Sequence, residues 1–194
     1  MSSPDSRFCA NDWREHCFPK EGPFCLGDAN AYASWRAAKL EAYPKSVDEL
    51  RVEVEDLANP SSAERAVVGE LCGAANMAIY DSGAAGSDAI RARPALRAFA
   101  ATFGLRDAEP HRSQGDDGIV AIEMAASGGR AGYIPYSNRP LSWHTDGYYN
   151  YHGPSDRVKA MVLHCVRDAA EGGVSALLDH EIAYIRLRDR DPGQ

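Results

Sequence analysis

The chain has 194 residues, a length typical of one domain or of a domain with a short extension. Apolar residues make up 44% of it and charged residues 25%, which are globular proportions and exclude wholesale disorder. The net charge of −7 argues against a nucleic-acid or an anionic-membrane partner, because both bind basic surfaces. No apolar run approaches the roughly 20 residues of a membrane-spanning helix, and residues 1–20 lack the apolar segment of a secretory signal.

The first half of the chain predicts two helices and two strands after an irregular arm. Residues 1–27 show no periodicity and are predicted to be this N-terminal arm, ahead of a domain over residues 28–194. Asp28 is a suitable N-cap for a predicted helix over 29–43, which Pro44 ends. The remaining elements follow from apolar periodicity and a turn at 59–62: a strand over 48–57, a helix over 63–76 and a strand over 77–80.

The second half predicts two further helices, with mainly short strands between them. The helix covers residues 94–103, and the two prolines in residues 133–142 favour an extended segment there. Apolar runs predict the remaining elements: strands over 120–124, 160–166 and 173–179, and a helix over 179–188. Helices followed by several short strands indicate an α+β fold with a mainly antiparallel sheet or barrel.

The cysteine content favours reduced thiols. The five cysteines are widely spaced and include no Cys-x-x-Cys pair: Cys9, Cys17, Cys25, Cys72 and Cys165. Three of them recur at eight-residue intervals, with His16 beside the second, but this spacing fits no metal-site geometry that we can justify. Ordinary reduced cysteines are therefore favoured over a metal cluster, and we expect a soluble, cytoplasmic protein.

The most informative pair of residues is His144 and Asp146. On an extended segment, residues two apart point to the same face, so both side chains can reach one metal ion. An imidazole and a carboxylate are two of the three protein ligands in the 2-His-1-carboxylate triad of non-heme Fe(II) enzymes. By itself the spacing is common, and it is more typical of a surface histidine followed by a helix-capping aspartate than of a metal site.

A second motif begins 27 residues after His144. The run Glu-Gly-Gly-Val-Ser over residues 171–175 follows the pair, and Leu-His-Cys over 163–165 stands between them. In this order the chain resembles the Fe(II)/2-oxoglutarate-dependent dioxygenases of the taurine dioxygenase (TauD/TfdA) family, nearest to its γ-butyrobetaine hydroxylase-like members. Residues 32–40 and 89–105 also resemble family elements, so the resemblance covers most of the chain from about Ala31 onward. It implies a double-stranded β-helix, or jelly roll, with N-terminal helices.

The resemblance implies a role for four residues. His144 and Asp146 match the first two iron ligands, and Ser175 matches the hydroxyl that contacts a carboxylate of 2-oxoglutarate. Asn138 lies where relatives place a polar side chain facing substrate or co-substrate, although a turn asparagine that bonds its own backbone is equally compatible. The implied cofactors are Fe(II), 2-oxoglutarate and O2, and the implied reaction is the hydroxylation of a small molecule with release of succinate.

Other residues near the motif have competing explanations. Tyr148, Tyr149 and Tyr151 could hold a trimethylammonium group by cation–π attraction, but packing is the commoner role of such tyrosines. His164 lies in an apolar run and is predicted to be a core histidine with a hydrogen-bond partner. His180 lies too close to the motif to match the second histidine ligand of the family.

The chain also departs from the family pattern. Relatives carry a second ligand histidine and then an arginine that binds 2-oxoglutarate, and nothing after Asp179 matches them. A jelly roll closes by pairing early strands with late ones, so half of it leaves open sheet edges. We therefore expect one subunit of a split, hetero-oligomeric enzyme, completed by a second protein chain. There are two alternatives: a fragment, or a catalytically inactive pseudo-oxygenase that acts as a binding or regulatory partner. The resemblance does not specify the substrate.

Overall fold

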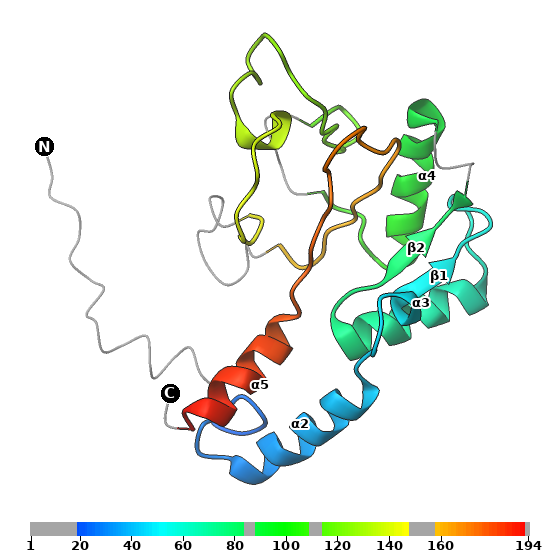
Figure 1. The fold of residues 1–194 in the computed structure, drawn as a ribbon. Helices are drawn as coiled ribbons and strands as arrows, with labels where there is room; N and C mark the ends of the chain where they lie inside the picture. The colour runs from blue at the N-terminus through cyan, green and yellow to red at the C-terminus, as the bar shows by residue number, and fades with distance from the viewer. Residues whose placement is uncertain (1–18, 84–87, 109–113, 148–157, 193–194) are drawn as a thin grey trace, which may run out of the picture. The chain divides into compact units, whose positions relative to one another are not determined.

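The structure is a computed structural model that describes residues 19–83, 88–108, 114–147 and 158–192. These residues fall into two compact units (Figure 1). The first unit contains residues 19–52, 67–79 and 174–192, and the second contains the described residues within 53–66 and 80–173. Among the helices of the described ranges, none is long and apolar enough to cross a membrane.

Two helices far apart in the sequence lie side by side in the first unit (Figure 1). Helix α2 spans Ala29–Ala42, and Asp28 caps it by accepting a hydrogen bond from the Ala31 N–H at 3.0 Å. Helix α5 spans His180–Arg190, and Asp179 caps it in the same way with the Glu181 N–H at 2.8 Å. Both predicted helices are confirmed. Each begins after an aspartate because the capping carboxylate accepts hydrogen bonds from amide groups that the first turn leaves without a partner.

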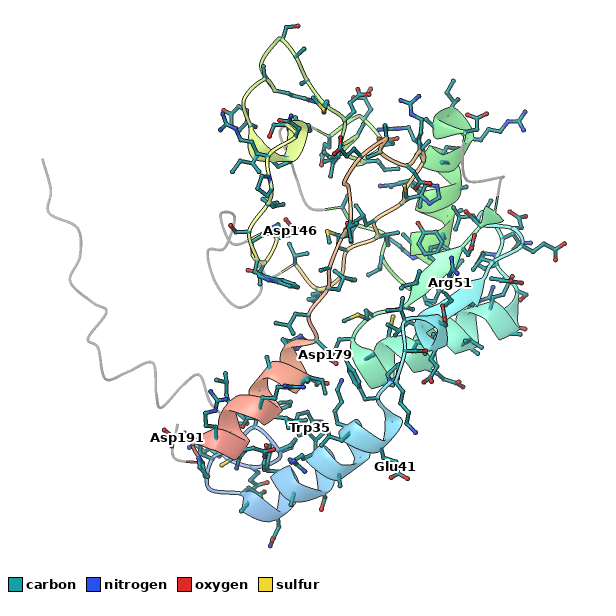
Figure 2. The ribbon with its side chains drawn as sticks, viewed as in Figure 1. Trp35, Glu41, Arg51, Asp146, Asp179 and Asp191 are labelled. Atoms are coloured by element: carbon teal, nitrogen blue, oxygen red, sulfur yellow. The ribbon has the colours of Figure 1, made fainter. Side chains whose placement is uncertain are left out.

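Aromatic rings and one buried arginine hold α5 in the first unit. The rings form one cluster: Phe24, Tyr32, Trp35 and Tyr184. Trp35 extends from α2, and its ring centroid lies 6.1 Å from that of Tyr184 on α5 (Figure 2). The Arg188 guanidinium donates to the carbonyl oxygens of Pro23, Cys25 and Leu26 at 2.8, 3.1 and 3.3 Å. The described part of the predicted arm, residues 19–27, is therefore a set of turns bound to α5.

The two strands of the structure are short. Strand β1 spans Arg51–Glu53 and pairs with β2, which spans Ile79–Asp81, in a two-stranded sheet. The strand predicted over 48–57 is thus too long, since its start is the 3-10 turn η1 over Asp48–Leu50. A strand continues only where a partner supplies ladder hydrogen bonds, and β2 is three residues long. The alternation of Leu50, Val52 and Val54 still identified the buried side of the segment, since Val52 and Val54 are buried and Leu50 is half-buried.

Helix α3 spans Ser62–Ala75 and connects the two strands. Its start is a capping box: the Glu64 N–H donates to Ser61 Oγ at 3.2 Å, and Glu64 Oε2 accepts from the Ser61 N–H at 2.5 Å. Helix α4 spans Ala89–Thr102, five residues longer at its start than predicted. The helix begins earlier than predicted because Asp88 caps it. Pro94 therefore lies inside the helix, where its fixed φ is helical and its missing N–H removes one backbone hydrogen bond.

The strands predicted over 120–124, 160–166 and 173–179 do not form within the described ranges. The segments are irregular apart from a single antiparallel bridge between Gln114 and Val120. The predicted extended segment over 133–142 contains the 3-10 turn η3, Ile134–Tyr136. Several apolar side chains of the predicted strands are exposed by more than half: Ile122, Met124, Met161, Leu163, Val174, Leu177 and Leu178. An extended segment becomes a strand only when a neighbouring strand pairs with it through backbone hydrogen bonds, and these segments have no such neighbour within the described ranges. The jelly roll therefore stays a prediction.

Candidate functional site

His144 and Asp146 lie close together in an irregular segment of the second unit. The Nδ1 atom of His144 is 2.8 Å from the carbonyl oxygen of Ser142. Since a carbonyl oxygen only accepts, Nδ1 carries the proton, and in the neutral ring Nε2 then presents a lone pair. That Nε2 atom is 3.6 Å from Asp146 Oδ1. A backbone acceptor on one ring nitrogen is how proteins orient a metal-binding histidine.

The two side chains fit a shared metal ion. Metal ligands of these types lie about 2.0–2.2 Å from a divalent ion, so a nitrogen and an oxygen 3.6 Å apart can both contact one ion. Both side chains are accessible, with 39% of His144 and 45% of Asp146 exposed. No group of three or more His, Cys, Asp or Glu residues with metal-binding geometry occurs within 19–83, 88–108, 114–147 and 158–192. The described residues therefore bring together two ligands of the expected three.

A glycine fixes the backbone directly after Asp146. Gly147 has a φ of +80°, a left-handed conformation that side-chain-bearing residues rarely adopt. A Cβ atom at this position would also lie far inside van der Waals contact with Val158 Cγ2. The close approach of residue 158 and the turn after Asp146 both depend on the missing side chain.

The other predicted site residues belong to either unit or lie outside the described residues. Asn138 is exposed in a bend after η3, and no contact with His144 or Asp146 occurs among its described interactions. Ser175 is exposed in the first unit, four residues before the cap of α5. Tyr148, Tyr149 and Tyr151 lie outside the described residues. The roles of all five stay predictions.

His164 is a half-buried histidine with a partner, as predicted. Its Nδ1 atom is 3.0 Å from the Tyr80 hydroxyl, and the two rings stack with centroids 5.8 Å apart. Burial raises the pKa of Tyr80 to about 12, so this hydroxyl keeps its proton over the physiological range. The pair joins β2 to the segment that carries His164 within the second unit.

A buried charged network in the first unit was not predicted. The Lys39 ammonium is 2.8 Å from Asp179 Oδ2 and 2.5 Å from Glu181 Oε2. The Asn76 amide donates to Asp179 Oδ1 and to Glu181 Oε2, each at 2.9 Å. Burial disfavours both charges, but the short contacts of the ammonium with the two carboxylates, and the hydrogen bonds that Asp179 accepts, outweigh it: the pKa of Lys39 is raised above, and that of Asp179 lowered below, its ordinary value. The one sequence signal was Asp179 as the residue that begins α5.

Comparison with known proteins identifies a family. The family described as "Taurine catabolism dioxygenase TauD, TfdA family" matches residues 87–194, more than half of the chain. The matched range contains His144, Asp146 and Ser175. No curated protein matches the chain, and no solved structure does.

Proposed function

The chain belongs to the TauD, TfdA family of dioxygenases, and from this membership we propose that it supplies two iron ligands of a non-heme Fe(II)/2-oxoglutarate-dependent dioxygenase. The observation that carries the proposal is the 3.6 Å separation of His144 Nε2 and Asp146 Oδ1 together with the Nδ1 hydrogen bond to Ser142. When bound, Fe(II) would let O2 oxidise 2-oxoglutarate to succinate and CO2 while one oxygen atom enters a C–H bond of the substrate.

The chain's own residues prepare this site before any ion binds. The Ser142 carbonyl keeps the proton on Nδ1, which leaves Nε2 as the ligand atom and limits rotation of the ring. Asp146 adds an anionic oxygen, and the accessibility of both side chains leaves room for further ligands.

The finer assignments extend this proposal to the co-substrate and the substrate. Ser175 donates a hydrogen bond to a carboxylate of 2-oxoglutarate, and Asn138 faces the substrate or the co-substrate. Tyr148, Tyr149 and Tyr151 contact the substrate, a small molecule. These roles rest on the family motif, and the exposure of Ser175 and Asn138 is compatible with them.

We further propose that a second protein subunit completes the jelly roll. It would supply the distal histidine, the arginine for 2-oxoglutarate and the strands that close the sheet. The support is the exposed apolar side chains of segments 160–163 and 174–178, which a pairing strand and a second sheet would cover.

Activity of the chain alone and of its assembly tests both parts. A tag on this chain would recover the assembly under native conditions from the cells that produce it, and succinate release from 2-oxoglutarate would be measured with Fe(II). We expect the isolated chain to bind Fe(II) weakly without turnover, and the assembly to release succinate. His144→Ala and Asp146→Ala should abolish that release, and His180→Ala, an exposed histidine at the start of α5, should preserve it. Full turnover by the isolated chain would contradict the second subunit.

The alternative is a catalytically inactive pseudo-oxygenase that acts as a binding or regulatory partner. It is favoured by one observation: the described residues group only two metal-ligating side chains at this site. In that case His144→Ala would leave affinity for the partner subunit and the biological effect of the complex unchanged. Loss of succinate release in the same variant would exclude this alternative.

A further inference from the structure

The Lys39–Asp179 pair is the most deeply buried ion pair of the described residues. Only 4% of the Lys39 side chain and none of the Asp179 side chain is exposed. Lys39 comes from α2, Asn76 from the residue after α3, and Asp179 and Glu181 from the start of α5. Three elements that are distant in the sequence therefore meet at one carboxylate, which Figure 2 shows where α5 begins.

Stability alone does not account for this network. Removing two charges from water is costly, and replacing a buried ion pair by apolar residues of similar volume is often neutral or stabilising. A buried ion pair in turn favours one arrangement, because any other leaves a charge without a partner. Asn76 also holds a φ of +58°, which is uncommon for a residue with a side chain. The network thus fixes where α5 starts more than it adds to the stability of the unit.

The start of α5 is also the end of the segment that carries Ser175. Among the described interactions, residues 174–178 make no hydrogen bond, and the side chains of Val174, Leu177 and Leu178 are 94%, 62% and 63% exposed. Asp179, the next residue, is bonded by Lys39, Asn76 and the Glu181 N–H. Within the first unit, Asp179 is therefore the first bonded residue after this segment.

We propose that Lys39, Asn76 and Glu181, acting through Asp179, are positioning residues for Ser175. This inference rests on the proposed role of Ser175 in binding 2-oxoglutarate. The network holds the backbone at Asp179, four residues from Ser175. The segment that carries the hydroxyl is therefore already ordered when the co-substrate binds, and binding costs less conformational entropy.

The ordering part of this proposal can be tested on the full chain without any ligand. Asn76→Gly removes both amide hydrogen bonds and tolerates the positive φ, and Lys39→Met removes the ammonium. Arg36→Gln is the matched control, because it removes the ion pair of α2 with Asp189 near the other end of α5. Backbone 15N relaxation should show order parameters for residues 174–178 that are lower than in the wild type in the first two variants only. Unchanged values in Asn76→Gly, which leaves no buried charge unpaired, would overturn the proposal even if Lys39→Met fails to fold.

The functional part is tested by a double-mutant cycle on the binding of 2-oxoglutarate. Calorimetry under anaerobic conditions would compare the Fe(II)-loaded assembly with its Asn76→Gly, Ser175→Ala and doubly substituted forms. We expect Asn76→Gly to raise the Kd about 10-fold, and to have no further effect once Ser175 is alanine. Additive effects would show that Asn76 does not act through Ser175. An unchanged Kd in Ser175→Ala alone would instead contradict the proposed function of Ser175, while the relaxation data still decide the ordering.

Discussion

The two units of the chain differ in how their ends and loops are held. In the first, both ends of α5 are bonded: Asp179 by Lys39 and Asn76, and Asp189 by the Arg36 guanidinium at 2.7 Å. In the second, the segments after residue 119 form no regular strand within the described ranges, and several of their apolar side chains face solvent. The candidate metal ligands belong to this less regular unit.

This difference separates buried charges whose loss destabilises the chain from the exposed side chains that are proposed to bind the metal ion. Buried charges in the first unit have partners from the same unit, so removing one of them leaves another uncompensated. The side chains of His144 and Asp146 are 39% and 45% exposed on an irregular segment, and binding residues are common on such segments. Substitutions of the same chemical kind should therefore change stability in one unit and metal binding in the other.

The largest contrast should come from two aspartates. Asp179→Ala leaves the Lys39 ammonium buried beside Glu181 alone, and should lower the free energy of unfolding by about 3–5 kcal/mol. Asp146→Ala removes a carboxylate that is 45% exposed, and should change it by less than about 0.5 kcal/mol. Urea titration measures both, and Fe(II) binding should fall in Asp146→Ala. Equal destabilisation by the two substitutions would contradict the division of roles.

A smaller effect should come from the turn after Asp146. Gly147→Ala forces a side chain into a left-handed conformation and against Val158, and should cost about 1–3 kcal/mol of stability. Gly129→Ala is the control in the same unit, because Gly129 has no positive φ and no atom near the position of an added Cβ. Urea titration gives the free energies and calorimetry the Fe(II) affinity. Wild-type values in Gly147→Ala would show that the segment around Asp146 is more adaptable than its backbone geometry indicates.

Local signals in the sequence predicted the helices well. Asp28 and the Ser61–Glu64 pair act within a few residues of themselves, so a cap can be recognised from its neighbours alone. The proximity of His144 and Asp146 was predicted for the same reason, although their segment is not a strand. Pro94 misled the prediction, because proline is common at the first position of a helix, whereas this helix begins at Ala89 after the cap at Asp88.

Long-range partners were beyond the sequence. Lys39 stands among alanines on a helix, and nothing in that pattern distinguishes a buried lysine from a solvated one. The pairing with Asp179 appears only when α5 lies against α2. The strands predicted over 160–166 and 173–179 failed for a related reason, since apolar composition favours a strand but hydrogen bonds to a partner make one.

The smallest predicted effect tests whether the second unit also has a well-fixed loop. Hydrogen bonds from Arg93 hold the pKa of Asp117 at about 2, below its ordinary value of 3.8, and tie the loop around Asp117 to α4. Because this pKa is lowered by folding, the carboxylate stabilises the chain above about pH 4, and the contribution is lost as the pH falls from about 4 toward 2. About a third of each side chain is exposed, so solvent screening limits the effect to about 1 kcal/mol.

Urea titrations between pH 6 and about pH 2.5 would compare the wild type with Asp117→Asn, and with Asp116→Asn as the exposed neighbouring control. The destabilisation by Asp117→Asn should shrink as the pH falls, while Asp116→Asn should show no such trend. Wild-type stability of Asp117→Asn at every pH would assign the anchoring of this loop to the Arg97 bond to the Asp117 carbonyl, 2.8 Å long, rather than to the ion pair. The second unit would then hold this loop to α4 through backbone bonds alone, unlike the ion-paired α5 of the first.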